Sequence, residues 1–78
     1  MKPKRVEPMI GGGMVWALPG STLEVMWAGP GSRLLIGQPR VAGGSVTSID
    51  HPSASGSFDT LRDAEAALTS FVNAASLA

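Results

Sequence analysis

The closest approach to an enzyme-like arrangement in this sequence is His51, which follows Asp50 in a serine-rich segment. A catalytic triad needs a serine, a histidine and a carboxylate that meet in space with a defined geometry. Neighbouring residues do not easily reproduce that geometry, and none of the serines lies in the elbow motif that exposes a nucleophile. We therefore interpret His51 as a loop histidine beside a turn-forming aspartate, and we predict that the chain is not an enzyme.

Metal and cofactor sites are not indicated by the remaining residues. The sequence contains no cysteine and a single histidine, whereas a zinc site normally needs about four convergent ligands. The glycine triplet 11–13 is followed by Met14 and Val15, not by the lysine and hydroxyl residue of a phosphate-binding loop. We expect either a flexible hinge or a close backbone contact at this triplet. No cofactor and no metal ligand are predicted.

Basic side chains are the candidates for binding nucleic acid, and they are Lys2, Lys4, Arg5, Arg33 and Arg40. Side chains of this type contact phosphates. The net charge of the whole chain is zero, which argues against strong attraction to nucleic acid or to an acidic membrane surface. The charge is nevertheless divided, because residues 1–49 carry five basic and two acidic side chains and residues 50–78 carry one basic and four acidic side chains. This division either helps the two parts to pack together or steers a partner to one side.

The length of 78 residues predicts one domain with a thin margin of stability. Because disulfides are excluded, oligomerisation is the remaining way to reinforce so small a core.

No apolar run approaches the roughly 18 residues of a membrane span, and the basic start is followed by Val6-Glu7-Pro8 instead of an apolar signal region. We therefore expect a cytoplasmic or virion protein without a membrane partner. The alanine- and glycine-rich composition is typical of a high-GC bacterium or its phage.

Two Pro-Gly turns, at residues 18–21 and 29–32, divide residues 14–38 into three short apolar runs. This pattern is typical of an antiparallel meander. A further short strand is indicated only weakly at residues 45–49.

Residues 1–13 are rich in proline and glycine and poor in large side chains, so we interpret them as a flexible N-terminal arm, with a single domain over residues 14–78.

The register of the meander follows from the positions of its turns. Centring the first turn on its Pro-Gly pair places Trp16 opposite Leu23. Centring the second turn in the same way places Trp27 opposite Leu34. Both registers gather large apolar side chains on one face, and a slip of one residue would reverse the face of every side chain in a strand. The predicted apolar face carries Met14, Trp16, Leu18, Leu23, Val25, Trp27, Leu34 and Ile36.

The C-terminal part of the chain predicts an amphipathic helix from about Thr60 to Ala75. Thr60 can cap the first turn, and Asp63 places a carboxylate near the positive end of the helix dipole. Charged and polar side chains, Glu65 among them, lie opposite an apolar stripe formed by Leu61, Ala64, Leu68, Phe71, Val72 and Ala75. The predicted fold is therefore α+β, with a three- to four-stranded antiparallel β-meander and one C-terminal amphipathic helix packed on its tryptophan face.

The opposite face of the sheet is more apolar than a solvated face usually is, because it carries Val15, Met26 and Leu35 beside Glu24. Two interpretations are open: ordinary scattered apolar residues that Glu24 keeps wet, or a surface that a partner covers. Both interpretations of the face stay open. For the function, we predict a self-associating or partner-binding module that uses these four residues.

A meander followed by a helix that starts with Phe58-Asp59-Thr60 is loosely similar to the small sheet-reading DNA-binding domains at the amino end of tyrosine integrases. That resemblance implies DNA contact through a sheet face rich in arginine and lysine. Here the corresponding face carries Met26, Leu35 and Glu24. Weak nucleic-acid binding is therefore the alternative to the favoured function, which is a small non-catalytic protein-interaction module acting as an accessory or regulatory protein.

Overall fold

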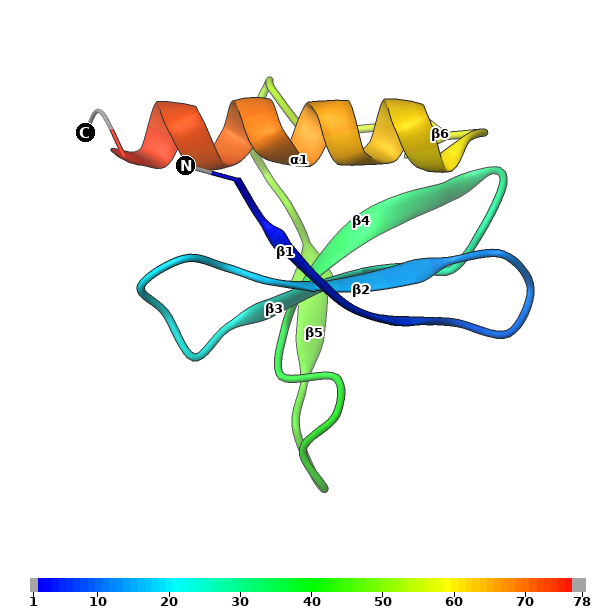
Figure 1. The fold of residues 1–78 in the computed structure, drawn as a ribbon, viewed down its shortest axis with the longest axis vertical. Helices are drawn as coiled ribbons and strands as arrows, with labels where there is room; N and C mark the ends of the chain where they lie inside the picture. Colours follow the sequence, from blue (N-terminus) through cyan, green and yellow to red (C-terminus); the bar gives the residue numbers. More distant parts are fainter. Residues whose placement is uncertain (1, 77–78) are drawn as a thin grey trace.

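The structure, a computed structural model, describes residues 2–76. Within this range an antiparallel sheet has the order β1-β2-β3-β4-β5, and a short strand, β6, pairs with the beginning of β4. The helix α1 lies across one face of the sheet (Figure 1). The predicted α+β meander with a C-terminal helix is confirmed, with more strands than predicted. The elements are β1 (Lys4–Pro8), β2 (Met14–Ala17), β3 (Glu24–Trp27), β4 (Ser32–Gly37), β5 (Val46–Ser48), β6 (Ser57–Phe58) and α1 (Leu61–Ser76).

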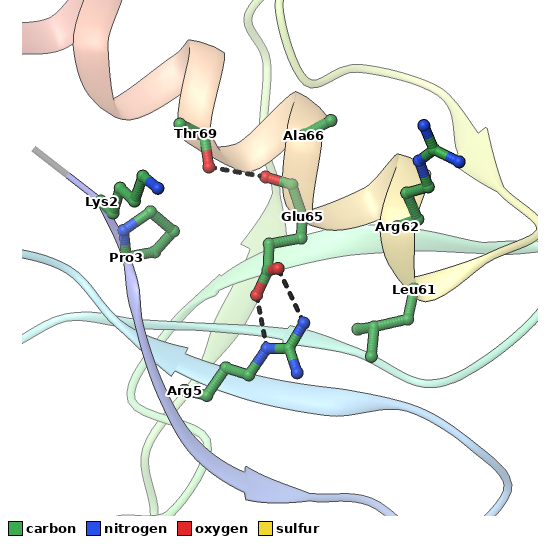
Figure 2. A pocket seen from close by; sticks show the side chains of 8 residues that line it. All are labelled: Lys2, Pro3, Arg5, Leu61, Arg62, Glu65, Ala66 and Thr69. Carbon is green, nitrogen blue, oxygen red and sulfur yellow. Dashed lines mark hydrogen bonds and ion pairs between the residues drawn. The ribbon is translucent and has the colours of Figure 1, made fainter.

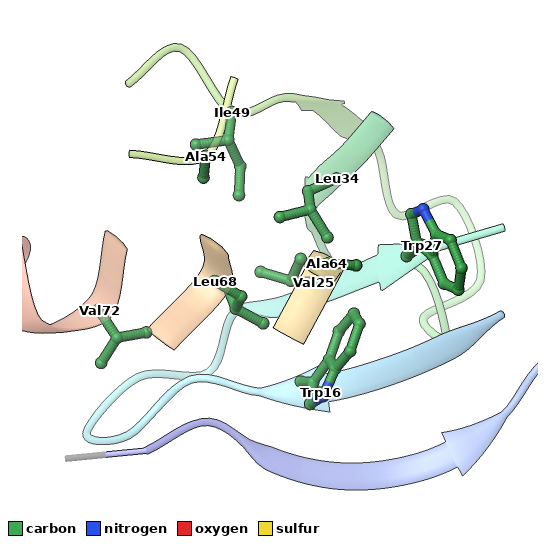
Figure 3. Packing of buried hydrophobic residues seen from close by; sticks show 9 residues of the cluster. All are labelled: Trp16, Val25, Trp27, Leu34, Ile49, Ala54, Ala64, Leu68 and Val72. Carbon is green, nitrogen blue, oxygen red and sulfur yellow. The ribbon is translucent and has the colours of Figure 1, made fainter. Parts of the chain in front are cut away.

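The core lies between α1 and the tryptophan face of the sheet. Both indole rings point to this side, as predicted, and Leu68 of α1 packs against the same cluster (Figure 3). The predicted helical stripe is confirmed for Ala64, Leu68 and Val72, which are buried. On the predicted apolar face of the sheet, Leu23 is 39% exposed and lies outside the core. The residues that form the buried cluster are Trp16, Val25, Trp27, Leu34, Ile49, Ala54, Ala64, Leu68 and Val72.

The register of β2 and β3 differs from the predicted one by two residues. Trp16 pairs with Val25, not with Leu23. Proline cannot adopt the positive φ that a tight two-residue hairpin turn prefers, so the turn at residues 18–21 is followed by two further loop residues before pairing resumes. The backbone N–H of Leu18 donates to the carbonyl of Leu23 across this loop at 3.2 Å. A shift of two residues leaves every side chain on its predicted face.

The second hairpin has the predicted register, with Trp27 opposite Leu34. Its Pro-Gly pair is preceded by Gly29, whose φ is 132°. We attribute the tighter hairpin to this glycine, because its backbone freedom relieves the mismatch between the turn and the twist of the strands. The first hairpin has Leu18 at the equivalent position.

The N-terminal region differs from the predicted flexible arm over residues 1–13 at the residues that pair with β2. Residues 4–8 form β1, which pairs antiparallel with β2. The strand has few large apolar side chains, and its main-chain ladder with β2 holds it in the sheet. In the glycine triplet, a Cβ on Gly13 would lie 1.9 Å from the carbonyl oxygen of Trp27, so a close backbone contact is the correct alternative there.

The helix follows the prediction closely, whereas the segment before it is more structured than predicted. The hydroxyl of Thr60 accepts a hydrogen bond from the N–H of Asp63 at 3.1 Å, so the predicted cap is confirmed. The weakly predicted strand at residues 45–49 is present as β5. Residues 51–57, predicted to be a surface connection, include buried Ala54 and lead into β6.

Among residues 2–76, no helix combines the length and apolar character that crossing a membrane would require.

Candidate interaction face

The sheet face that points away from α1, here called the far face, carries the residues predicted to form an interface. Val15 of β2 pairs with Met26 of β3, and Met26 pairs with Leu35 of β4. Side chains of directly opposed residues lie on the same face, so these three form one row across the sheet. Glu24 lies two residues before Met26 and therefore on the same face.

Accessibility differs along this row. Val15 is only 4% exposed, so the structure removes it from the surface that a partner could touch. Met26 and Leu35 are half-buried. Val15 and Met26 line a groove of about 380 Å³ together with residues of the hairpin that connects β1 and β2. At the tip of this hairpin Ile10, which also lines the groove, is fully exposed.

An ion cluster lies beside the apolar row. The Nε of Arg40 donates to both carboxylate oxygens of Glu24 at 3.0 Å, and it lies 3.8 Å from an oxygen of Glu7. The hydrogen bonds from Arg40 lower the pKa of Glu24; burial opposes this with a smaller effect, and the positive charge of Arg40 adds the smallest contribution, again lowering the pKa. Arg40, predicted as a phosphate contact, is thus partnered within the chain by two carboxylates of the same face.

The basic residues predicted as nucleic-acid contacts do not gather on one surface. Arg5 points toward α1 and pairs with Glu65. Lys4 lies on β1 opposite Ala17, whereas Arg33 lies on β4, and two strands separate them. Together with the pairing of Arg40, this placement leaves Lys2, Lys4 and Arg33 without an ion pair among the described residues.

Glu65 is a second polar centre, between β1, β2 and α1, that the sequence analysis missed. It was predicted to lie on the solvated side of the helix, but its side chain is half-buried. Its two oxygens accept hydrogen bonds from Nε and Nη2 of Arg5 at 2.7 and 2.8 Å, as Figure 2 shows, and one of them accepts a third from Nε1 of Trp16 at 2.8 Å. These bonds, those of Arg5 foremost, lower the pKa of Glu65 to about 2.

The Arg5–Glu65 pair joins the basic first part of the chain to the acidic second part. It therefore supports the interpretation that the division of charge helps the two parts to pack. No pattern in the sequence pairs residues that are 60 positions apart. The only available signal was the separation of charge itself.

His51 lies in the connection that leads from β5 to β6. Its Nδ1 accepts a hydrogen bond from the N–H of Ser53 at 3.1 Å, and its ring meets the ring of Phe71 edge-on with centroids 5.4 Å apart. Both contacts fit a histidine that stabilises a loop under the helix. Within residues 2–76, no three histidine, cysteine or carboxylate side chains converge as a metal site would require.

Comparisons of the chain with protein-family models, with curated protein sequences and with solved structures found no match. Its function is therefore proposed from its own surface chemistry.

Proposed function

We propose that this chain is a small non-catalytic interaction module that self-associates through its far face, with a second copy of the chain as the partner. The observation that carries this proposal is the apolar row of the far face, with accessible Met26 and Leu35, beside a groove whose rim presents fully exposed Ile10. Contiguous apolar surface that is rimmed by polar groups marks interaction sites on small proteins.

The charges of the far face favour a second copy over a charged partner. Arg40 is already paired with Glu24 and Glu7, so covering this face would not leave a buried charge without its partner. The net charge of the chain is zero, so two copies do not repel each other. A two-fold interface brings the same patch together from both subunits, and an apolar row beside a groove is self-complementary in this sense.

Size supports the same proposal. A core of this size without disulfides has a small free energy of unfolding, and small domains commonly increase their stability by association. Nucleic-acid binding is less favoured because Arg5 and Arg40 would have to exchange carboxylates within the chain for phosphates. The proposed role is therefore that of an accessory or regulatory protein that acts as an oligomer.

Sedimentation velocity over a range of protein concentrations tests the proposal. We expect the wild-type chain to sediment as a dimer and Ile10→Asp to shift it to a monomer, because the substitution places a charge inside the interface. The side chain of Ile10 is fully exposed, so its replacement should leave the thermal unfolding midpoint of the monomer unchanged. Leu23→Asp is the matched control, because Leu23 is exposed but does not line the far-face groove.

Two results would overturn the proposal. The first is a wild-type chain that remains monomeric up to about 1 mM, a concentration that corresponds to an association free energy of only about 4 kcal/mol. The second is a dimer that Leu23→Asp dissociates and Ile10→Asp does not. Salt-sensitive retention on a heparin column by the monomer would favour the nucleic-acid alternative instead.

A further inference from the structure

The outer edge of β5 is a second surface with unsatisfied bonding capacity, distinct from the far face. β5 ends the path of the sheet, and no strand within residues 2–76 pairs with its outer side. All of its residues, Val46 to Ser48, are exposed. An edge of this kind offers main-chain donors and acceptors to another chain.

The hydrogen bonds at the two ends of β5 show which groups point outward. The N–H of Gln38 donates to the carbonyl of Ser45 at 3.1 Å, and the N–H of Ile49 donates to the carbonyl of Leu34 at 3.2 Å. Residues 45 and 49 therefore direct their main-chain groups toward β4. Because these groups alternate sides along a strand, Thr47 also points inward, while Val46 and Ser48 each present an N–H and a carbonyl to the open edge.

Beside this edge, two hollows of about 350 Å³ each share Leu23 and Ile36 in their walls. The first continues to Val46 and Thr47 of β5, and the second continues under the helix to Phe71. We call the two together the edge groove. Among residues 2–76, no charged side chain lines either hollow. Leu23 and Val46, both on the rim, are among the exposed large apolar residues of the described chain.

We infer that the outer edge of β5 and the edge groove bind an extended, uncharged segment of a partner protein, which adds as a strand beside β5 and directs an apolar side chain across Thr47 toward the edge groove. The free main-chain groups of Val46 and Ser48 select an extended segment over a helix, because a helix satisfies its own main chain. The uncharged walls select an apolar side chain, since a charged one would lose its hydration without gaining a partner. This inference does not rest on the proposed far-face dimer.

The test is an NMR titration of the full ¹⁵N-labelled chain with a blocked pentapeptide of alternating threonine and valine. We expect saturable shifts of the amide signals of Val46, Ser48 and Leu23. Slower amide-hydrogen exchange at Val46 should accompany them, because its N–H becomes hydrogen-bonded. A peptide of the same sequence that is N-methylated at every residue is the matched probe, since it keeps the side chains but has no N–H on either edge with which to complete a ladder.

Two variants assign the binding to the proposed contacts. Val46→Pro removes an outward N–H while the inward bonds to β4 remain, and it should weaken binding of the pentapeptide by about tenfold. Leu23→Asp should weaken binding by a similar factor, because it places a charge in the groove. Ile10→Asp should leave binding unchanged. It is also monomeric under the proposed function, so it keeps the two surfaces experimentally separate.

Several results would overturn the inference. These are an absence of shifts at millimolar pentapeptide, equal affinity for the N-methylated peptide, or shifts confined to Met26 and Leu35. Shifts at Val46 and Ser48 that depend on protein concentration without any peptide would also overturn it, because a second copy of β5 would then be the occupant. If Val46→Pro proves unfolded by circular dichroism, the comparison between the two peptides decides the question on the wild-type chain.

Discussion

The two faces of the sheet are formed by the same strands, but they differ in how far their apolar side chains are buried. On the face under α1, every buried side chain that the structure describes is apolar, and the indole N–H groups of Trp16 and Trp27 both have hydrogen-bond partners. On the far face, half-buried Met26 and Leu35 lie beside the ion cluster of Arg40. The first face is closed over the two tryptophans and stays open only toward Leu23, whereas the second leaves its central apolar row accessible.

This difference shows how a small domain divides its apolar residues between folding and association. Adjacent residues of β4 make the division concrete, because Leu34 is buried under the helix and Leu35 lies half-exposed on the far face. Burial under the helix contributes to the stability of the monomer. Apolar surface that the monomer leaves open contributes to stability only when the surface of another molecule covers it.

The largest expected effect is the contrast between Leu34→Ala and Leu35→Ala. We expect Leu34→Ala to lower the free energy of unfolding by about 2–5 kcal/mol, because it leaves a cavity in a closed core. We expect Leu35→Ala to cost less than about 1.5 kcal/mol in the monomer, where the site is already partly open to water. Urea denaturation of both variants in the Ile10→Asp background, which removes the proposed dimer, measures this difference. Equal costs would mean that the far face is part of the folding core.

A smaller effect is expected at the polar centre on the helix side. Glu65→Gln keeps an oxygen for the indole N–H of Trp16 but loses the charge that binds Arg5. We expect it to lower the free energy of unfolding at neutral pH by on the order of 1–2 kcal/mol, after allowance for the partial exposure of the pair. The Arg40 cluster on the far face should contribute less, because no buried indole N–H adds to the bonds of Glu24 as that of Trp16 does at Glu65.

The same pair predicts a pH dependence. The pKa of Glu65 is lowered from 4.5 to about 2 in the folded chain, so its stabilisation is complete above the unfolded pKa and is lost as pH falls from about 4.5 toward 2. Thermal unfolding of wild type and Glu65→Gln across this window should show the two midpoints converging as pH decreases. A midpoint difference that stays constant with pH would show that the charge of Glu65 does not stabilise the fold.

The helix-side face could be predicted from the sequence because its signals are local and redundant. Alternating apolar residues, two Pro-Gly turns and a helical stripe all indicate the same surface. Even the error of two residues in the β2–β3 register left Trp16 on the correct face, because side-chain orientation depends on parity and not on the absolute register.

The edges of the sheet and the ion pairs could not be predicted in the same way. β1 is held by its main-chain ladder, and a strand of this composition resembles a disordered arm in sequence. The partners of Glu65 and Arg40 depend on which strands lie side by side in three dimensions. Helical periodicity alone places Glu65 on the solvated side, whereas the position of β1 brings Arg5 to it.

The smallest expected effect is that of Arg40→Gln on the far face. Glu24 would lose the hydrogen bonds that lower its pKa, so the stability that this pair contributes above the unfolded pKa of Glu24 would disappear. We expect a decrease in the thermal midpoint smaller than that of Glu65→Gln, and one that shrinks as salt screens the exposed pair. The same variant leaves Glu24 and Glu7 on the far face without a basic partner, so dimerisation should weaken more than folding does. Sedimentation and thermal unfolding of this variant at low and high salt compare the two losses directly, and a loss of stability without any loss of association would place the contact between copies elsewhere on the molecule.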